Sequence, residues 1–194
     1  MQYVAASNFA PTAEIPALRS YKMDFAYLHL MLNHVPVFAV VFGFIILLGG
    51  VLARSKVVTG VGLGLLALGA IAAIPVYLTG EAAEETIENL PGVSESITSQ
   101  HESAAFFSLG LAIVSGVFAI ASLLLTRSLW AKLSGYVVVA TLLMSFLTGI
   151  SMIRTANLGG QIRHTEIRSG AQNADPNTET GTKEKGKSGK DDDD

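Results

Sequence analysis

The chain contains no cysteine, which excludes disulfides, thiolate metal centres, covalently attached c-type haem and a cysteine nucleophile. Any metal ion must therefore be held by His, Asp, Glu or Met. Charge is also scarce, since 15% of the 194 residues are charged and 50% are hydrophobic. This balance is far more apolar than that of a typical soluble domain. It indicates a membrane protein with a polar tail.

Basic clusters and catalytic motifs are missing as well. The chain has 13 Lys and Arg against 16 Asp and Glu, for a net charge of -3. Because binding to phosphate backbones requires clustered cations, we expect no nucleic-acid partner. The sequence has no Gly-x-Ser-x-Gly, His-Glu-x-x-His or P-loop motif, and no Gly-x-Gly-x-x-Gly beside a strand. Nothing in it indicates an enzyme.

Four long apolar runs dominate the chain. Each is close to or above the roughly 20 residues that span a bilayer as a helix. We predict an all-α bundle of four transmembrane helices within residues 23–168, at about 25–53, 57–78, 104–125 and 130–153. The first run is longer than one span needs and contains Pro36, which should kink it. Its first third is expected to project beyond the hydrocarbon.

The two ends of the chain differ from this apolar region. Residues 1–22 are expected to be an unstructured extension, and they lack the pattern of a secretory signal. Met23, followed by the good N-cap Asp24, is a candidate alternative translation start. Residues 169–194 are polar and predicted to be disordered, and their final DDDD is either a native acidic tail or an added one.

The connectors predict an orientation. Connectors one and three are short and basic, whereas the second carries several glutamates and no Lys or Arg. By the positive-inside rule, the basic connectors face the cytoplasm, and both termini and the acidic connector lie outside. Residues 81–90 predict a short amphipathic helix within the acidic connector. Ser99 and Glu102 fit a capping box, which would start the third helix beside His101.

An internal repeat is suggested by the spacing of small residues. Each half has a histidine, a glycine nine residues later, a second glycine six residues after that, and then a Leu-Thr-Gly tripeptide: His34, Gly43, Gly49 and 78–80 in one half, His101, Gly110, Gly116 and 147–149 in the other. Two repeated hairpins would be related by a pseudo-twofold axis along the membrane normal. Alternatively, the glycines only permit close helix packing.

All four histidines are expected on one side of the bilayer, because helices alternate in direction. His34 and His101 stand where hydrocarbon begins, and opposed imidazoles in a membrane bundle are typical axial ligands of haem b. We therefore predict that His34 and His101 bind haem, with Arg163 or Arg168 pairing with its propionates.

The alternative is a zinc or copper site. Its candidate ligands are His29, His34, His101, His164, Glu81, Glu84 and Glu102. Residues five apart do not share a helical face, so His29 and His34 would act together only if Pro36 breaks the helix. Each candidate ligand also has a purely structural interpretation. His29 would form a hydrogen bond with Asn33, and Glu102 would cap a helix. The connector glutamates would form a solvated face, and His164 would lie in a surface loop.

The run from His29 to Pro36, the Thr-Gly-Glu-Ala-Ala-Glu segment after the second helix and His101-Glu102 resemble a group of small bacterial four-helix membrane proteins. The resemblance covers residues 23–168. Members often read His-Pro at the first histidine and Phe-Pro after the second, where this chain has Leu30 and Val35. The resemblance implies a bacterial inner membrane and a haem or redox partner, with no established activity.

Together these features predict a haem- or metal-binding protein in the lipid of the inner membrane that supports electron transfer, with its site at the outer face. The acidic connector would then offer a docking surface to a basic redox protein. The alternative function is a cofactor-free accessory or assembly subunit of a larger membrane complex, whose histidines only satisfy interfacial hydrogen bonds.

Overall fold

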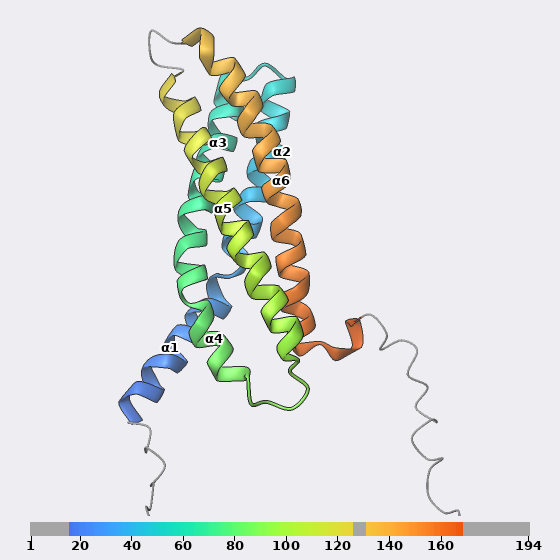
Figure 1. The fold of residues 1–194 in the computed structure, drawn as a ribbon. Coiled ribbons are helices and arrows are strands. Elements are labelled where there is room, and N and C mark those ends of the chain that lie inside the picture. Colours follow the sequence, from blue (N-terminus) through green and yellow to red (C-terminus); the bar gives the residue numbers. More distant parts are fainter. Residues whose placement is uncertain (1–15, 126–130, 169–194) are drawn as a thin grey trace, which may run out of the picture.

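The computed structural model describes residues 16–125 and 131–168, and side chains are described from Asp24 onward, except those of residues 131 and 132. These ranges are helical and contain no strand (Figure 1). The elements are α1 (Pro16–Leu32), α2 (His34–Leu52), α3 (Lys56–Leu78), α4 (Gly80–Ile87), α5 (Glu95–Leu125), α6 (Ala131–Arg163) and the short 3-10 helix η1 (Thr165–Ile167). The all-α prediction is confirmed.

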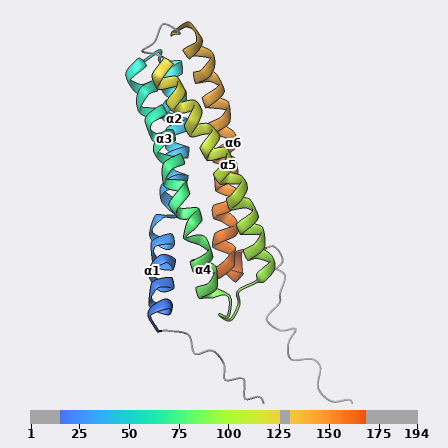
Figure 2. The ribbon, with the colours of Figure 1, turned by 60° about the vertical axis from the view of Figure 1, so that its left-hand side comes forward.

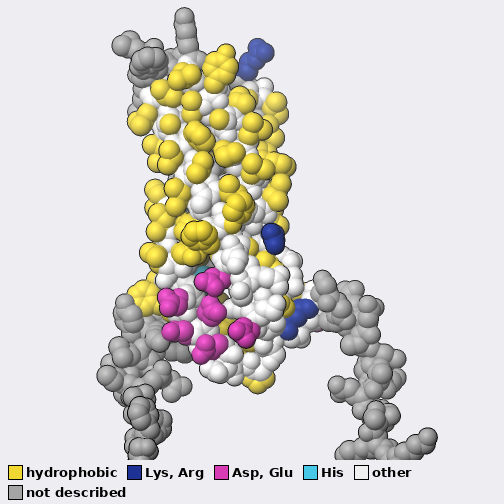
Figure 3. Space-filling model, viewed as in Figure 1, with side chains coloured by type: hydrophobic (Ala, Val, Ile, Leu, Met, Phe, Trp, Pro, Cys, Tyr) yellow, Lys and Arg dark blue, Asp and Glu magenta, His cyan; other side chains and the backbone are white. Residues whose placement is uncertain are grey.

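Four segments are long and apolar enough to cross a membrane. They are Asp24–Leu52, Lys56–Leu78, Glu95–Leu125 and Leu133–Arg163. Only about a third of each apolar window is buried inside the protein, so most hydrophobic side chains face outward. Figure 3 shows these side chains over most of the length of the bundle, with acidic side chains gathered at the end where α4 lies. This distribution is that of a bundle whose outer surface meets lipid.

The four long helices pack as two hairpins side by side. α2 lies along α3, and α5 lies along α6; α3 also packs on α5, and α2 on α6. α2 and α5 are therefore diagonal to each other. α1 packs mainly on α4, below the bundle in the views of Figures 1 and 2. The buried core includes Val40, Leu47, Leu63 and Leu66.

Backbone contact holds the α2–α3 hairpin together. A Cβ atom added to Gly62 would lie 2.5 Å from the backbone nitrogen of Leu47, and one added to Gly50 would collide with the backbone of Thr59. Lipid is as apolar as leucine, so it does not drive helices together; close approach through small residues does. Gly50 and Gly62 are the positions where this hairpin needs glycine.

Hydroxyl groups line the α5–α6 hairpin instead. Ser108, Ser115 and Ser122 recur every seven residues on α5 and are almost fully buried. Ser122 Oγ lies 3.1 Å from Thr141 Oγ1 on α6, and Ser108 Oγ lies 2.7 Å from Ser151 Oγ. Interhelical hydrogen bonds of this kind join helices in lipid. The helices of the first hairpin are thus held together by backbone contact, and those of the second by hydrogen bonds between hydroxyl groups.

The break expected from Pro36 is confirmed. α1 ends at Leu32, Asn33 forms a turn, and α2 begins at His34. Proline has no N–H to donate to the carbonyl four residues earlier, that of Leu32, and its ring clashes there. α1 itself begins at Pro16, so residues 16–22 are helical where we expected no structure. Proline is favoured at a first helical position because its φ is preset.

The ends of α5 and α6 near α4 lie beyond the predicted bounds. α5 begins at Glu95, so Ser99 and Glu102 are inside the helix, and the predicted capping box is wrong. α6 continues to Arg163, ten residues past the apolar run. Thr98 and Ile162 are both buried, because the two helices stay in contact beyond the apolar region. This contact between α5 and α6 stabilises helical turns that are no longer hydrophobic enough to be predicted as membrane spans.

Other expectations have mixed outcomes. The amphipathic connector helix is present as α4, from Gly80 to Ile87. Residues 1–15, 126–130 and 169–194, with the predicted disordered tail and part of the third connector, lie outside the described residues.

The predicted repeat does not extend to equivalent packing. Gly43 contacts Leu66, whereas a Cβ on Gly110 would meet nothing within 4 Å in the described structure. In the second pair of glycines it is the first member that has no close neighbour: a Cβ on Gly49 would meet nothing within 4 Å in the described structure, whereas Gly116 lies against Ala70. Thr79 follows the end of α3, but Thr148 is buried in the middle of α6.

Adjacent glycines in α2 provide a test of the backbone contact. Gly50→Ala should lower the melting temperature in detergent, because overpacking against the Thr59 backbone costs about 1–3 kcal/mol. Gly49→Ala is the control; its side is open, so the better helix propensity of alanine should leave stability unchanged or raise it by up to about 1 kcal/mol. Equal effects of the two changes would contradict the close α2–α3 contact.

Candidate functional site

Two histidines are anchored to backbone carbonyls of neighbouring helices at one end of the bundle. His29 Nδ1 of α1 lies 2.9 Å from the carbonyl oxygen of Val76 on α3. His101 Nδ1 of α5 lies 3.0 Å from the carbonyl oxygen of Thr155 on α6. A carbonyl only accepts hydrogen bonds, so Nδ1 is the protonated nitrogen in both rings. Thr79 Oγ1, at 3.4 Å, is a second and longer contact of His29 Nδ1.

A glycine makes room for each ring. Gly80 follows Val76 by four residues, and Gly159 follows Thr155 by the same interval. A Cβ atom on Gly159 would lie 3.1 Å from His101 Cε1, which is tighter than an ordinary contact, and one on Gly80 would lie 3.7 Å from His29 Cε1. The same arrangement of carbonyl, glycine and imidazole thus occurs in both halves of the protein.

These anchors leave the other ring nitrogen available. Within the described part of the chain, Nε2 of His29 and of His101 has no hydrogen-bond partner. A neutral imidazole protonated at Nδ1 presents its lone pair at Nε2, and a carbonyl acceptor for Nδ1–H is the usual support of a metal-binding histidine. We refer to these two similarly anchored residues, His29 and His101, as the two-histidine site.

His34 is placed differently. It begins α2 with an exposed side chain, and its ring stacks on that of Phe38 at a centroid distance of 6.1 Å. No described contact joins His34 to His101, and the predicted haem pair stays a prediction. The break at Asn33 separates the faces of His29 and His34, so that His29 contacts α3 and His34 faces outward.

An unsatisfied polar atom lies one turn from His29. Oδ1 of Asn33 is buried and has no hydrogen-bond partner in the described structure. The backbone N–H of Asn33 donates to His29 O at 2.9 Å, but the side-chain bond between these residues, one of our structural interpretations, is not formed. A buried acceptor of this kind is normally satisfied by protein, water or a bound group.

A cluster of carboxylates covers the same end of the molecule. Burial raises the pKa of Glu84 in α4 above its ordinary value, and the charges of Glu102, Glu88 and Glu81 raise it further. These four glutamates form the acidic patch, which is visible in Figure 3. Glu102 belongs to this patch rather than to a helix cap. The patch makes the end of the bundle that carries the two histidines electronegative.

The predicted metal-ligand set is not assembled. Among residues 16–125 and 131–168, no group of three or more His, Asp or Glu side chains lies close enough to hold a metal ion. His164 follows α6 directly and is exposed, as expected for a surface position, and its Nδ1 lies 2.9 Å from Glu166 Oε1. A hydrogen bond from its own backbone, and then the His164 ring, lower the pKa of Glu166.

The two arginines expected to pair with propionates have different surroundings. Arg168 donates to the carbonyl oxygens of Gln161, Ile162 and Gly92 at 2.8, 3.0 and 2.7 Å. It therefore caps the end of α6 and ties it to the connector before α5. Arg163 is exposed in the last turn of α6, where a cation complements the helix dipole. Arg163 is the more available cation of the two.

The acidic patch predicts a pH-dependent stability. The pKa of Glu84 is raised in the folded state, so its contribution to stability is present at low pH and is lost as pH rises through that raised value. Glu84→Gln should therefore raise the melting temperature at pH 7.5 by a few degrees and have no effect near pH 4. Thermal unfolding monitored by circular dichroism provides the measurement.

The control is Glu95→Gln, which changes an exposed acid in the first turn of α5. This change should not stabilise the protein, because a negative charge at a helix N-terminus is favourable. Loss of stability in Glu84→Gln at pH 7.5 would contradict the repulsion within the patch.

Sequence reasoning found both histidines of this site but not their pairing. The sequence feature that could have indicated the pairing is a glycine four residues after each anchoring carbonyl: Gly80 after Val76 and Gly159 after Thr155. The two-histidine site, the buried oxygen of Asn33 and the acidic patch define the candidate site. The chain matches no protein-family model, no curated protein and no solved structure.

Proposed function

We propose that the protein binds haem b iron through Nε2 of His29 and His101 and supports electron transfer in the membrane. One observation carries the proposal: both imidazoles are fixed by Nδ1–H bonds to backbone carbonyls, and both leave Nε2 without a described partner. His29 takes the role that the sequence pattern suggested for His34. Metal-binding histidines are normally held in this way.

The number of ligands favours haem over a protein-bound zinc or copper ion. Zinc sites use three or four protein ligands, whereas a porphyrin supplies four nitrogen donors of its own and leaves two axial positions for imidazoles. The two-histidine site offers two imidazoles whose Nε2 atoms have no described partner. These are the residues that would hold the iron of a b-type haem.

Each nearby residue has a part in this proposal. The carbonyls of Val76 and Thr155 orient the rings and increase the basicity of Nε2. Oδ1 of Asn33 can accept a hydrogen bond from a bound group or from an ordered water. Arg163 can pair with a propionate, since its side chain is exposed, whereas the N–H groups of Arg168 already bind carbonyls.

The acidic patch indicates the kind of protein that would bind at this end of the bundle. A surface that carries Glu81, Glu84, Glu88 and Glu102 would steer a basic redox protein toward the two-histidine site. We place the protein in a bacterial inner membrane with this end outside. The exposed Arg54 and Lys56, at the opposite end of α2 and α3, favour that orientation by the positive-inside rule, and Arg154, Arg163 and Arg168 at the acidic end count against it.

Histidine variants test the haem proposal. The protein expressed with adequate haem supply and purified in detergent should show a Soret band of a six-coordinate haem. His29→Ala and His101→Ala should each reduce haem content by tenfold or more, because each removes an axial ligand. His34→Ala and His164→Ala are the controls and should retain the full spectrum. Loss of the band in His34→Ala, with retention in His29→Ala, would contradict the assigned pair.

A second pair of variants tests ring position without removing a ligand. Gly159→Ala should weaken haem binding because its Cβ would press on His101, whereas Gly160→Ala meets only Ile167 at 3.7 Å and should not. Elemental analysis of the same samples measures zinc, copper and iron. Stoichiometric zinc or copper without haem would support a metal site. A colourless, metal-free and fully folded protein would support the accessory-subunit alternative and overturn the proposal.

A further inference from the structure

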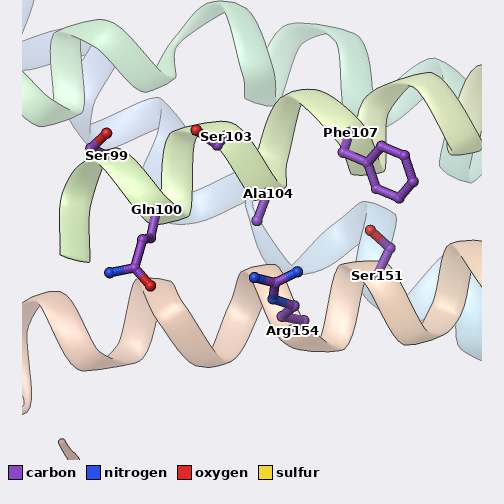
Figure 4. Close-up of a pocket in the computed structure, with 7 residues that line it drawn as sticks. All are labelled: Ser99, Gln100, Ser103, Ala104, Phe107, Ser151 and Arg154. Atoms are coloured by element: carbon purple, nitrogen blue, oxygen red, sulfur yellow. The ribbon is translucent and has the colours of Figure 1, made fainter. Parts of the chain in front are cut away.

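A shallow cavity lies on the outer surface between α5 and α6. Its volume is about 240 Å³, and its lining consists of Ser99, Gln100, Ser103, Ala104, Phe107, Ser151 and Arg154. In Figure 4 the guanidinium of Arg154 and the carboxamide of Gln100 lie between the two helices. The cavity is smaller than the roughly 300–1,000 Å³ that holds a drug-sized molecule. It can admit a group the size of a lipid headgroup.

The position along α6 sets the depth of this cavity in the membrane. Ile150 and Ile153, which precede Arg154, are exposed apolar residues. Asn157 and Gln161, which follow it, are joined by a hydrogen bond of 2.6 Å. The surface of α6 therefore changes from apolar to polar at Arg154. This boundary corresponds to the level of lipid headgroups.

Arg154 lacks a counter-ion among residues 16–125 and 131–168. Its side chain is exposed, and among the described residues it makes no ion pair or hydrogen bond. An uncompensated cation at the edge of hydrocarbon is costly, and its guanidinium is suited to bind phosphate through two parallel N–H bonds. The group that meets this surface at headgroup depth is a phospholipid phosphate.

The rest of the cavity fits the same ligand. Ser99 and Ser103 also line the cavity, and in Figure 4 their hydroxyls lie at the edge of α5 away from α6. Gln100 donates from Nε2 to Ser96 O at 3.2 Å, which leaves its Oε1 able to accept a bond from a headgroup hydroxyl. Phe107 is 63% exposed and offers an apolar wall to the first part of an acyl chain. A cation, a carboxamide and an apolar wall thus line one cavity.

We propose that this cavity binds the headgroup of an anionic phospholipid, with Arg154 as its phosphate ligand. The site lies between α5 and α6, and its lining includes neither His29 nor His101. It therefore does not depend on the proposed haem function. A glycerol headgroup suits it best, because Gln100 can accept from its hydroxyls and no described carboxylate neutralises Arg154.

Native mass spectrometry of the full chain in detergent micelles tests the site. Phosphatidylglycerol and phosphatidylcholine are added in separate and mixed titrations. The unaltered protein should retain one phosphatidylglycerol with about tenfold preference, and Arg154→Ala should abolish that preference. Arg154→Lys should keep part of it, since the charge remains but the paired N–H bonds are lost. Lys56→Ala, which removes another exposed cation at the opposite end of the bundle, is the control and should bind as before.

The possible results separate clearly. Equal retention of the two lipids, or a preference that survives Arg154→Ala, would overturn the proposal. Competition by millimolar inorganic phosphate that matches lipid binding would also overturn it, because it would indicate a site for free phosphate. Melting temperatures of the variants, measured in phosphatidylcholine alone, show that each is folded and should agree with that of the unaltered protein.

Discussion

A polar group inside hydrocarbon has no water to bind, so it must find its partner within the protein. Helices satisfy their backbone in this way, but they must still be joined to one another without help from the hydrophobic effect. In the α2–α3 hairpin the solution is backbone contact at Gly50 and Gly62. In the α5–α6 hairpin it is a row of buried hydroxyls that includes Ser108 and Ser122.

The same requirement shapes the two-histidine site. Val76 lies in the last turn of α3, where carbonyls lack partners within the helix, and its oxygen accepts from both Thr79 and His29. Thr155 lies inside α6, and its carbonyl oxygen has a second lone pair that His101 uses. Each imidazole is therefore held by a backbone group of a neighbouring helix, and each is held through the same nitrogen. The free nitrogens are a consequence of this anchoring and supply the chemistry that we propose.

The surroundings of the two-histidine site differ from one side to the other. On one side of it lies the apolar bundle, and on the other lies the acidic patch, where burial and then neighbouring carboxylates raise the pKa of Glu84. A positively charged partner is attracted to such a surface, whereas an anionic lipid is better bound on the side of α5 and α6 that carries Arg154. The two proposed ligands thus use surfaces of opposite charge at the same end of the molecule.

The sequence alone determined the four apolar spans and the break before Pro36, because hydropathy and the missing proline N–H are local properties. It also determined that all four histidines lie toward one end, which follows from the alternating direction of the helices. It did not determine which histidines pair. That depends on which carbonyls the rings of His29 and His101 meet on α3 and α6, and this is set by contacts between distant residues. The extension of α5 to Glu95 and the unequal roles of Gly43 and Gly110 have the same origin, since a helix end or a glycine acquires its meaning from the neighbour packed against it.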